Sequence, residues 1–469
     1  MLTLGHLFAA LGDYKITQEE PAITSIVVDS RDAEKGSFFV AFPGENVDGH
    51  DYVADAFARG AAVALIHRPL ADQTVIDPSQ TVGQLPPLPF CILVDDTETG
   101  LQQIARYWRS HFDLTAIGIT GSVGKTSTKE LTHAVLAQRF NTLKSEGNRN
   151  NEIGLPLTML ELRPRHTHAV LEMGMYAKGE IATLCSIAYP TIGIVSNIGP
   201  VHMSRLGSME AITEAKRELV EALPADGTAI LNRDDERVMS MIPYTKATIF
   251  TYGLTPEADL WAGEIQSMGL QGIRCTLHHG REAWRVQVPL LGLHSVHTVL
   301  RATAAGLVCG MEWDEIIRGL QKTQAQLRLV TTRGPRNSTI FDDTYNASPD
   351  SVIAALNLLA EMDGKKIAVL GDMLELGSAE EVSHRLVGQR ASMVVDHLVT
   401  IGTLGRIIGE AAWAGGMRPS QVYIAADVHE AVEHLEKVIE PKDFVLVKGS
   451  LGARLDRVVA ALSRTKGAV

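Results

Sequence analysis

The sequence has few cysteines, and no two of them lie close together. They form no C-x-x-C motif, which disfavours both a disulfide framework and a zinc site. We therefore expect free, buried thiols in a reducing compartment. The four residues are Cys91, Cys185, Cys275 and Cys309.

The chain also lacks long apolar runs and an excess of basic residues. No run approaches the roughly 18 residues that a membrane span needs, and the first residues show no signal-peptide pattern. Lys and Arg number 43 against 55 Asp and Glu, a formal net charge of −12, which disfavours a role in coating nucleic acid. We expect a cytoplasmic enzyme that neither enters a membrane nor binds nucleic acid.

A glycine-rich turn precedes a helical pattern in GITGSVGKTSTKELTHAV, residues 118–135. The backbone N–H groups of such a turn and the start of the following helix form an anion site. Lys125 would supply a point charge to the β- and γ-phosphates, and the Thr126 hydroxyl would be a ligand for Mg²⁺. Ile119 stands where the strict G-x-x-x-x-G-K-[ST] motif has its first glycine. The stretch predicts a nucleoside triphosphate site, with a plain glycine turn as the alternative.

Strands that alternate with helices predict an α/β protein of three domains, as does the length of 469 residues. We expect a small mixed α/β domain at 1–96 and a central parallel-sheet domain with the phosphate loop at 97–328. Alternating apolar residues at 272–290 predict an antiparallel hairpin beside the central sheet. Residues 329–469 resemble a Rossmann-like domain in outline, but no G-x-G-x-x-G follows its strands, which disfavours a nicotinamide or flavin cofactor.

Three side chains of the central region are candidate metal ligands. Glu172 ends the apolar strand HAVLEM, where open α/β sheets bind ligands, although it could equally face solvent. His202 follows another strand in a loop, where histidines are commonly exposed or structural. Lys216 lies in the apolar stripe of a predicted helix, so it must snorkel, pair or lose its charge. The alternative to snorkelling is an amine of depressed pKa that is modified into a metal ligand.

Two polar loops are further candidates. SEGNRNNEIGLPLTML carries three asparagines before a predicted helix, which indicates either a capped turn or a polar grip on a sugar or peptide. These residues are Asn148, Asn150 and Asn151. FDDTYNASPDS follows a strand and combines carboxylates, a phenol and an amide. A capped helix start accounts for part of this loop but not for Tyr345.

Taken together, these motifs resemble those of the Mur ligase family over about residues 25–460. VVDSR and PGENVDGHDYVADAFARGA are similar to its uridine-nucleotide module, and GITGSVGKTSTKE has the family's own form of the phosphate loop. The residues that this implies near a UDP-sugar are Ser30, Arg31, Asp48, Gly49 and His50. The residues that it implies at ATP in this loop are Gly121, Ser122, Val123, Gly124, Lys125, Thr126 and Ser127.

The resemblance also implies a metal and catalytic set. LEMGMYAKGEI and NIGPVHMSRLGSMEAITEAK place Glu172, His202 and Lys216 at family positions that, with Thr126, bind two Mg²⁺ ions. In that family the lysine is typically carbamylated by CO₂. Lys125, Glu172, His202 and Lys216 would then be the catalytic residues.

The motifs are most similar to the branch that joins D-alanyl-D-alanine to UDP-N-acetylmuramoyl-tripeptide. GNRNNEIGLPLT, DDTYNASPDS and VLGDMLELG carry this similarity and imply that the three asparagines bind substrate. The further residues implied at the nucleotide are His294, Arg328, Asp343, Tyr345 and Asn346. VLVKGSLGARLDRVV adds Lys448 and Arg454 as basic groups nearby.

One stretch departs from the family pattern. The family usually carries H-N-x-x-N where this chain has GLHSVHTVLRATAAG. His294 is kept, but Ser295 and Thr298 replace the two amides. The usual asparagine contact to adenine is therefore missing from the sequence.

The resemblance implies an ATP- and Mg²⁺-dependent amide ligase of peptidoglycan precursor synthesis. The reaction would pass through an acyl phosphate, and we expect a monomer. One alternative is a family member with another amino-acid acceptor, such as the ligase that adds the third residue or a folate-polyglutamate ligase. Another is a nucleotide-dependent switch or motor, although the chain has no N-K-x-D guanine motif.

Overall fold

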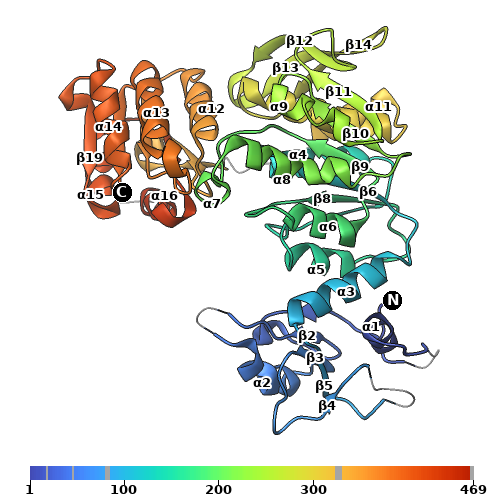
Figure 1. The fold of residues 1–469 in the computed structure, drawn as a ribbon. Coiled ribbons are helices and arrows are strands. Elements are labelled where there is room, and N and C mark those ends of the chain that lie inside the picture. Colours follow the sequence, from blue (N-terminus) through green and yellow to red (C-terminus); the bar gives the residue numbers. More distant parts are fainter. Residues whose placement is uncertain (17–19, 45–46, 80–84, 323–329, 465–469) are drawn as a thin grey trace. The chain divides into compact units, whose positions relative to one another are not determined.

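The chain carries three β-sheets in succession (Figure 1). The computed structural model describes residues 1–16, 20–44, 47–79, 85–322 and 330–464. These residues form two compact units, each of which is discontinuous in sequence. The first unit is Met1–Gly118, Phe140–Gly174 and Gly179–Thr191, and the second is Ile119–Arg139, Met175–Lys178 and Ile192–Val469.

The N-terminal sheet has five parallel strands in the order β1-β2-β3-β5-β4. The strands are β1 (Ile26–Val27), β2 (Phe38–Val40), β3 (Val63–Ile66), β4 (Val75–Ile76) and β5 (Phe90–Leu93). The helices are α1 (Leu4–Leu11) and α2 (Val53–Ala58), with single turns η1 (Ser30–Asp32) and η2 (Gly49–Tyr52). β2, β3 and most of β5 are buried, as expected for parallel strands covered on both faces.

The central sheet has nine strands in the order β14-β13-β12-β11-β10-β9-β6-β8-β7. The strands are β6 (Thr115–Thr120), β7 (Thr142–Lys144), β8 (His168–Glu172), β9 (Ile192–Val195), β10 (Thr228–Asn232), β11 (Thr248–Gly253), β12 (Leu260–Ser267), β13 (Ile273–His279) and β14 (Glu282–Val288). The predicted hairpin is confirmed as β13 and β14, in which Cys275 faces Val286 and Leu277 faces Trp284. The sequence did not indicate β12, which pairs antiparallel with β13 across a bulge between Gly263 and Gln266. The sheet is therefore mixed.

The helices of this region are α3 (Thr97–Arg109), α4 (Lys125–Leu136), α5 (Gly154–Leu160), α6 (Glu180–Ala188), α7 (Met203–Leu206), α8 (Met209–Glu221), α9 (Glu236–Met239), α10 (Val296–Val308) and α11 (Trp313–Lys322), with turns η3 (Ile242–Tyr244), η4 (Gly269–Gln271) and η5 (Leu293–Ser295). Of these helices, α3, α4, α5 and α8 begin close to where the sequence predicts a helix. Side-chain caps define several starts: the Asp96 carboxylate accepts from Thr99 N at 2.7 Å, and Ser208 Oγ accepts from Ala211 N at 3.1 Å.

The C-terminal sheet has six strands in the order β15-β16-β20-β17-β18-β19, and β15 is antiparallel to β16. The strands are β15 (Val330–Arg333), β16 (Thr339–Asp343), β17 (Lys366–Leu370), β18 (His397–Ile401), β19 (Val422–Ala425) and β20 (Phe444–Lys448). The helices are α12 (Pro349–Ala360), α13 (Glu380–Val394), α14 (Gly405–Ala414), α15 (Val428–Val438) and α16 (Asp456–Arg464), with turns η6 (Pro335–Asn337), η7 (Gly377–Ala379), η8 (Pro419–Gln421) and η9 (Leu451–Ala453). The strands β17 to β20 are parallel to one another, which agrees with the Rossmann-like outline that the sequence indicates.

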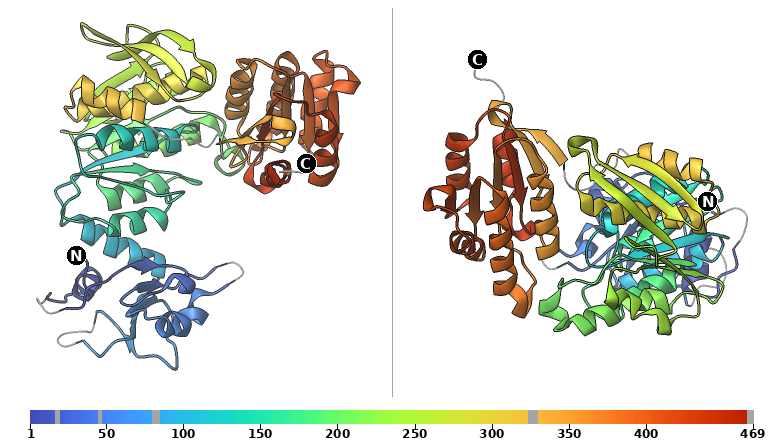
Figure 2. Two further views of the ribbon diagram at one scale, coloured as in Figure 1. Left: turned by 180° about the vertical axis from the view of Figure 1, so that it is seen from behind. Right: turned by 90° about the horizontal axis from the view of Figure 1, so that it is seen from above.

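Alternate residues of the C-terminal strands enter two separate hydrophobic cores. Phe341, Ala368 and Leu446 pack with residues of α12, α13 and α14. Ile340 and Val369 pack with residues of α15 and α16. Figure 2 shows the orange and red helices on both faces of this sheet. Burial on both faces explains why these strands are continuous apolar runs in the sequence.

All four cysteines are free thiols, and all but Cys309 are buried. Burial raises the pKa of the Cys91 and Cys275 thiols to about 12. Within the described ranges, no helix is both long enough and apolar enough to cross a bilayer.

Candidate active site

The predicted phosphate loop connects β6 to α4 and requires glycine at two positions. Gly121 has φ +138° and Gly124 has φ +85°, both in a region that disfavours side chains. A Cβ at Gly121 would lie 1.9 Å from Ser196 Oγ, so no larger residue fits there. Gly124 is the N-cap of α4. The loop thus leads directly into the N-terminus of a helix, which is the arrangement that an anion site needs.

The segment after β9 holds this loop in position. Ser122 Oγ donates to Gly199 O at 3.0 Å, and Val123 N donates to the Asn197 side-chain oxygen at 2.9 Å. Ser196 Oγ donates to Val123 O at 2.7 Å. The loop is therefore braced before any ligand binds.

Two lysines of the predicted catalytic set converge on one carbonyl oxygen. Lys125 Nζ donates to Gly121 O at 2.9 Å, and Lys216 Nζ donates to the same oxygen at 3.0 Å. Lys216 is only 2% exposed, so the snorkelling interpretation is wrong. Burial and the neighbouring Lys125 ammonium hold the pKa of Lys216 well below its ordinary value. Both effects favour the neutral amine over the ammonium.

His202 lies near these lysines, at the start of α7, in the left-handed conformation (φ +57°). Its Nδ1 is 2.8 Å from Glu375 Oε2, and the Tyr176 ring contacts it edge-on at 5.1 Å between centroids. Burial lowers the pKa of His202, the Glu375 carboxylate opposes this, and Lys216 and Lys125 lower it further. Glu375, itself at φ +65°, lies in the VLGDMLELG stretch but had no predicted role.

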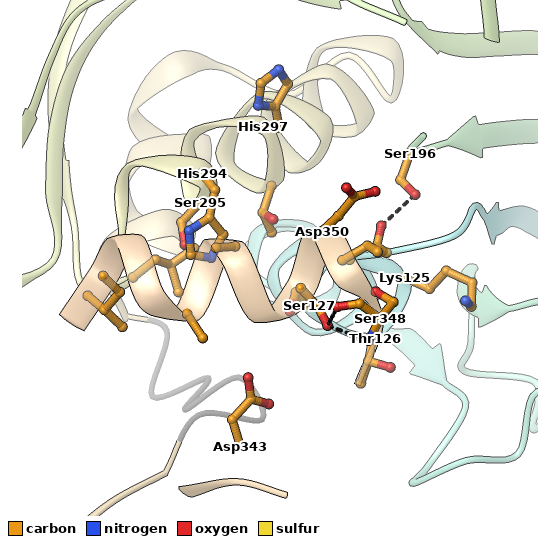
Figure 3. A pocket seen from close by; sticks show the side chains of 18 of the residues that line it. Lys125, Thr126, Ser127, Ser196, His294, Ser295, His297, Asp343, Ser348 and Asp350 are labelled. Carbon is orange, nitrogen blue, oxygen red and sulfur yellow. Dashed lines mark hydrogen bonds between the residues drawn. The ribbon is translucent and has the colours of Figure 1, made fainter. Parts of the chain in front are cut away.

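A cavity of about 910 Å³ lies beside the phosphate loop. Figure 3 shows side chains of the loop, of the start of α10 and of α12 around it. Of the predicted nucleotide residues, those that line it are Ser122, Val123, Gly124, Lys125, Thr126, Ser127, His294, Asp343 and Asn346. Gly121 and the 37%-exposed Tyr345 do not line it. Arg328 lies outside the described residues.

Charged groups of α10 and β20 face into this cavity. Lys448 is buried, lies 2.7 Å from Asp343 Oδ2 and donates to Asn346 O at 2.8 Å. Although His294 is an exposed residue, the surrounding cavity wall desolvates its ring, and the neighbouring His297, Arg301 and Lys448 add to this effect, so that its pKa falls to about 4. His294 is therefore neutral near pH 7.

The hydroxyls that replace the two family amides have partners within the protein. Ser295 Oγ donates to Leu291 O at 2.6 Å. Thr298 Oγ1 accepts a hydrogen bond from Arg301 Nη2 at 2.9 Å. The Ser295 proton is thus used in the turn before α10 and is not directed at a base.

Sequence reasoning missed three ionisable residues that line this cavity, Asp350, His297 and Arg301. Asp350 follows the proline that begins α12, so its place in the sequence indicates only a helix start. Burial and the nearby Asp235 carboxylate raise its pKa. The sequence indicates Arg301 only as a basic residue among the apolar residues of α10.

Glu172 and the asparagine-rich loop belong to the first compact unit. Glu172 is buried at the end of β8 and accepts a hydrogen bond from Asn150 Nδ2 at 2.9 Å. The Asn151 side-chain oxygen accepts from Gly154 N at 2.9 Å and so closes the turn before α5, although the N-cap of α5 itself is Ile153. Asn148 O accepts from Asn150 N at 2.7 Å. The loop therefore orients the Glu172 carboxylate, which the sequence did not indicate.

The predicted UDP-sugar residues surround η2 and α2 of the same unit. The Asp48 carboxylate accepts from His50 Nδ1 at 2.7 Å, and His67 N donates to His50 Nε2 at 3.1 Å. His50 is therefore the neutral tautomer with its proton on Nδ1. Ser30 Oγ donates to Asp55 Oδ2 on α2 at 2.8 Å, and Arg31 Nε donates to Asp29 Oδ1 at 2.9 Å. Gly49 N donates to Phe42 O at 2.8 Å.

Comparison with known protein families matches most of the chain. Residues 22–107 match the Mur ligase family catalytic domain, residues 119–306 the Mur ligase middle domain, and residues 327–451 the Mur ligase glutamate ligase domain.

Full-length relatives and solved structures agree with these matches. The UDP-N-acetylmuramoyl-tripeptide–D-alanyl-D-alanine ligases of Synechocystis sp. and Bacillus subtilis are each 36% identical over 95% of this chain, covering 93% and 94% of their own lengths. A crystal structure of MurF from Acinetobacter baumannii superposes with a TM-score of 0.86 at 31% identity and covers 99% of each chain. The MurF ligase of Thermotoga maritima in complex with ADP gives a TM-score of 0.80 at 25% identity over 94% of this chain and 97% of its own. The chain is a member of the Mur ligase family.

Proposed function

We propose that the protein is an ATP-dependent amide ligase that joins D-alanyl-D-alanine to UDP-N-acetylmuramoyl-tripeptide in the cytoplasm. The observation that carries this is the end-to-end similarity, at 36% identity, to enzymes that bear that name. The complex of a similar ligase with ADP supports ATP as the phosphoryl donor. The product would be a peptidoglycan precursor.

ATP would bind in the cavity beside the phosphate loop. The backbone N–H groups at the start of α4 and the Lys125 ammonium would hold its phosphates. Residues at the start of α10 and around α12 line the remainder of the cavity and would enclose the nucleoside. We propose the same role for Arg328, Tyr345 and Asn346, which the family resemblance assigns to the nucleotide.

The donor chemistry of Thr126 and Glu172 fits Mg²⁺. A hydroxyl and a carboxylate are the hard oxygen ligands that this ion prefers. His202 and Lys216 would complete a second site, and the ions would neutralise phosphate charge as the phosphoryl group moves. Among the described residues, no cluster of three His, Cys, Asp or Glu side chains is arranged to hold a metal ion. The second site would therefore depend on modification of Lys216.

Lys216 is suited to carbamylation. Only a neutral amine attacks CO₂, and burial favours that form of Lys216. The nitrogen forms a bond to the carbon of CO₂ and loses one proton, which leaves an anionic carbamate with two oxygen atoms. The buried amine is thereby converted into an anionic oxygen ligand.

The reaction would proceed in two transfers. The tripeptide carboxylate attacks the γ-phosphorus of ATP, and ADP leaves with the electrons of the broken P–O bond. The amine of D-alanyl-D-alanine then attacks the acyl phosphate carbon, loses a proton, and displaces inorganic phosphate. Lys125 would offset phosphate charge during the first transfer.

The UDP-sugar and peptide would bind through residues of the first compact unit. We propose this role for the Ser30–Arg31 and Asp48–His50 segments and for Asn148, with Asn150 and Asn151 shaping the loop. We also propose that 1–96, 97–328 and 329–469 are the substrate, ATP-binding and ligase domains, acting as a monomer.

The test is ADP release from UDP-N-acetylmuramoyl-tripeptide with different acceptors. D-Alanyl-D-alanine should support turnover, whereas free lysine, diaminopimelate or glutamate should not. Omitting the tripeptide nucleotide is the control for uncoupled ATP hydrolysis. Equal turnover with a single amino acid would contradict the proposal and favour another branch of the family.

A further inference from the structure

Arg301 is a buried cation in the wall of the nucleotide cavity. It lies on α10, is 5% exposed and lines the cavity. Its Nη2 donates to Thr298 Oγ1 at 2.9 Å, and its Nη1 donates to the Tyr252 hydroxyl at 3.4 Å. Its Nε has no hydrogen-bond partner among the described residues. Both partners of the guanidinium are neutral hydroxyls.

No anionic residue that the structure describes therefore balances the charge of Arg301, whose guanidinium carbon lies 5.9 Å from the centroid of the Tyr252 ring. In the part of the chain that the structure describes, no carboxylate lies within ion-pair distance of this guanidinium. Burying an unpaired charge is costly. Two other buried cations show how this chain ordinarily avoids the cost: Lys448 pairs with Asp343, and Arg109 donates to the carbonyls of Ala188, Phe112 and Leu114 at 2.8–3.0 Å. Among the residues described, Arg301 has neither an ion pair of this kind nor a set of carbonyl acceptors. Its side chain lines the cavity, so an anion bound there would supply the partner.

The guanidinium lies against the phosphate loop. A Cβ at Gly124 would be 2.9 Å from Arg301 Nη2. Gly124 is the N-cap of α4, and the positive end of this helix dipole favours an anion. The helix start and Arg301 thus supply positive charge to the same end of the cavity.

We propose that Arg301 binds the α- and β-phosphates of the nucleotide, as a second phosphate cation opposite Lys125. A guanidinium offers paired N–H donors that match phosphate oxygens. Thr298 and Tyr252 position the side chain, because each accepts one of its N–H groups. In this chain the hydroxyl that replaces a family amide thus serves the arginine and not the base.

This inference rests on the proposed use of ATP. It predicts how the effect of Arg301 is divided between KM and kcat. The α- and β-phosphates are common to ATP and ADP, so the contact is made in the substrate complex as well as during transfer. Such uniform binding changes KM more than kcat. Arg301 would also slow the release of ADP.

The test is calorimetric binding of ADP and adenosine, with Mg²⁺ present, to Arg301→Met. Loss of a charge-assisted phosphate contact should raise the Kd for ADP about tenfold or more, while the Kd for adenosine stays within about twofold. Thr298→Val, which removes the positioning hydroxyl, should raise the ADP Kd by a smaller factor. Arg109→Met is the matched control, because it removes a buried arginine that does not line the cavity, and it should leave both constants unchanged.

Melting without nucleotide separates a binding role from a structural one. Arg301→Met should melt at the same temperature as the wild type or higher, since an unpaired buried charge is removed. Arg109→Met should melt lower, because its carbonyl partners are left unsatisfied. An unchanged ADP Kd, or an equal loss for ADP and adenosine, would overturn the inference alone. A wild-type protein that binds no ADP would overturn the proposed function as well.

Discussion

At the scale of single residues, two lysines meet at the Gly121 carbonyl. Two lysine amines donate to it, one from the phosphate loop and one from α8. Two ammonium ions so close together repel each other, and the buried one is the less able to stay charged. Lys125 and Lys216 are therefore chemically distinct although they share one acceptor.

Lys125→Ala should abolish turnover and leave the fold intact. The side chain is only partly buried, and its proposed role is to offset phosphate charge. We expect a loss of more than about 10³-fold in kcat/KM, or about 4 kcal/mol of barrier. ADP-release kinetics, with circular dichroism as the folding control, measure this. Activity within tenfold of wild type would exclude the role.

Lys216 should carry a carbamate in the active enzyme. Lys216→Ala should lose nearly all activity, and a small added carboxylic acid should restore part of it by supplying an oxygen ligand. Lys216→Arg should not work, because a guanidinium stays cationic and does not take up CO₂. NMR of enzyme labelled with ¹³C-bicarbonate detects the adduct directly. A free amine in a fully active preparation would contradict the prediction.

At the scale of secondary-structure elements, two histidines join β18 to α15. His397 Nε2 lies 2.8 Å from His434 Nε2, and the Tyr423 ring of β19 stacks on His434 with centroids 3.8 Å apart. Burial, the neighbouring His434 and Lys365 together lower the pKa of His397 to about 4. Two nitrogens at this distance share one proton, so the pair does not hold two positive charges.

The His397–His434 contact should lower the free energy of unfolding in mild acid. As pH falls from about 6.5 to about 4, His397 takes up a proton in the unfolded chain but not in the folded one. The unfolded state thus binds more protons in this window, and stability falls by about 2–3 kcal/mol. Urea unfolding at pH 7.5 and pH 4.5 measures this loss.

Two histidine variants test this explanation, one at the buried His397 and one at the exposed His429. His397→Phe keeps an aromatic ring but does not titrate, so its stability should depend less on pH. His429→Gln, on the exposed surface of α15, is the matched control and should follow the wild type. The same pH dependence in His397→Phe and wild type would show that other groups cause the loss.

At the scale of the whole molecule, the cavity is the feature that joins distant parts of the chain. Residues of the phosphate loop, of α10 and of α12 line it, and all lie in the second compact unit. His202 and Glu375 add a direct contact between the segment after β9 and the segment after β17. A ligand in the cavity would touch segments that lie more than 200 residues apart in the sequence.

Nucleotide binding should therefore stabilise these segments together. At one hundred times its Kd, ADP should add about 2.7 kcal/mol to stability. Hydrogen exchange should slow in 118–135, in 293–301 and in 339–351 when ADP is added, and adenosine should protect 118–135 less. Protection confined to 118–135 would mean that the ligand does not contact the other two segments.

The local pattern of the sequence predicted most of the elements. The periodicity of apolar residues predicts strands and amphipathic helices. Closely spaced glycines predict the turn, because few other structures need them. β12 escaped because its side chains have no regular alternation across the bulge. The role of Asn151 in the turn before α5 could be predicted, but not the hydrogen bond from Asn150 to Glu172, which joins residues 22 positions apart.

The sequence by itself determined the α/β architecture, the phosphate loop and the family, because these depend on contacts among neighbouring residues and on motifs of fixed spacing. Only the tertiary structure decided that Lys216 is buried, that it shares an acceptor with Lys125, and that Arg301 faces the phosphate loop. Burial and pairing depend on which distant segments meet, and a pKa or an uncompensated charge follows from that meeting. A lysine or arginine in an apolar stripe is ambiguous until its neighbours across the fold are known.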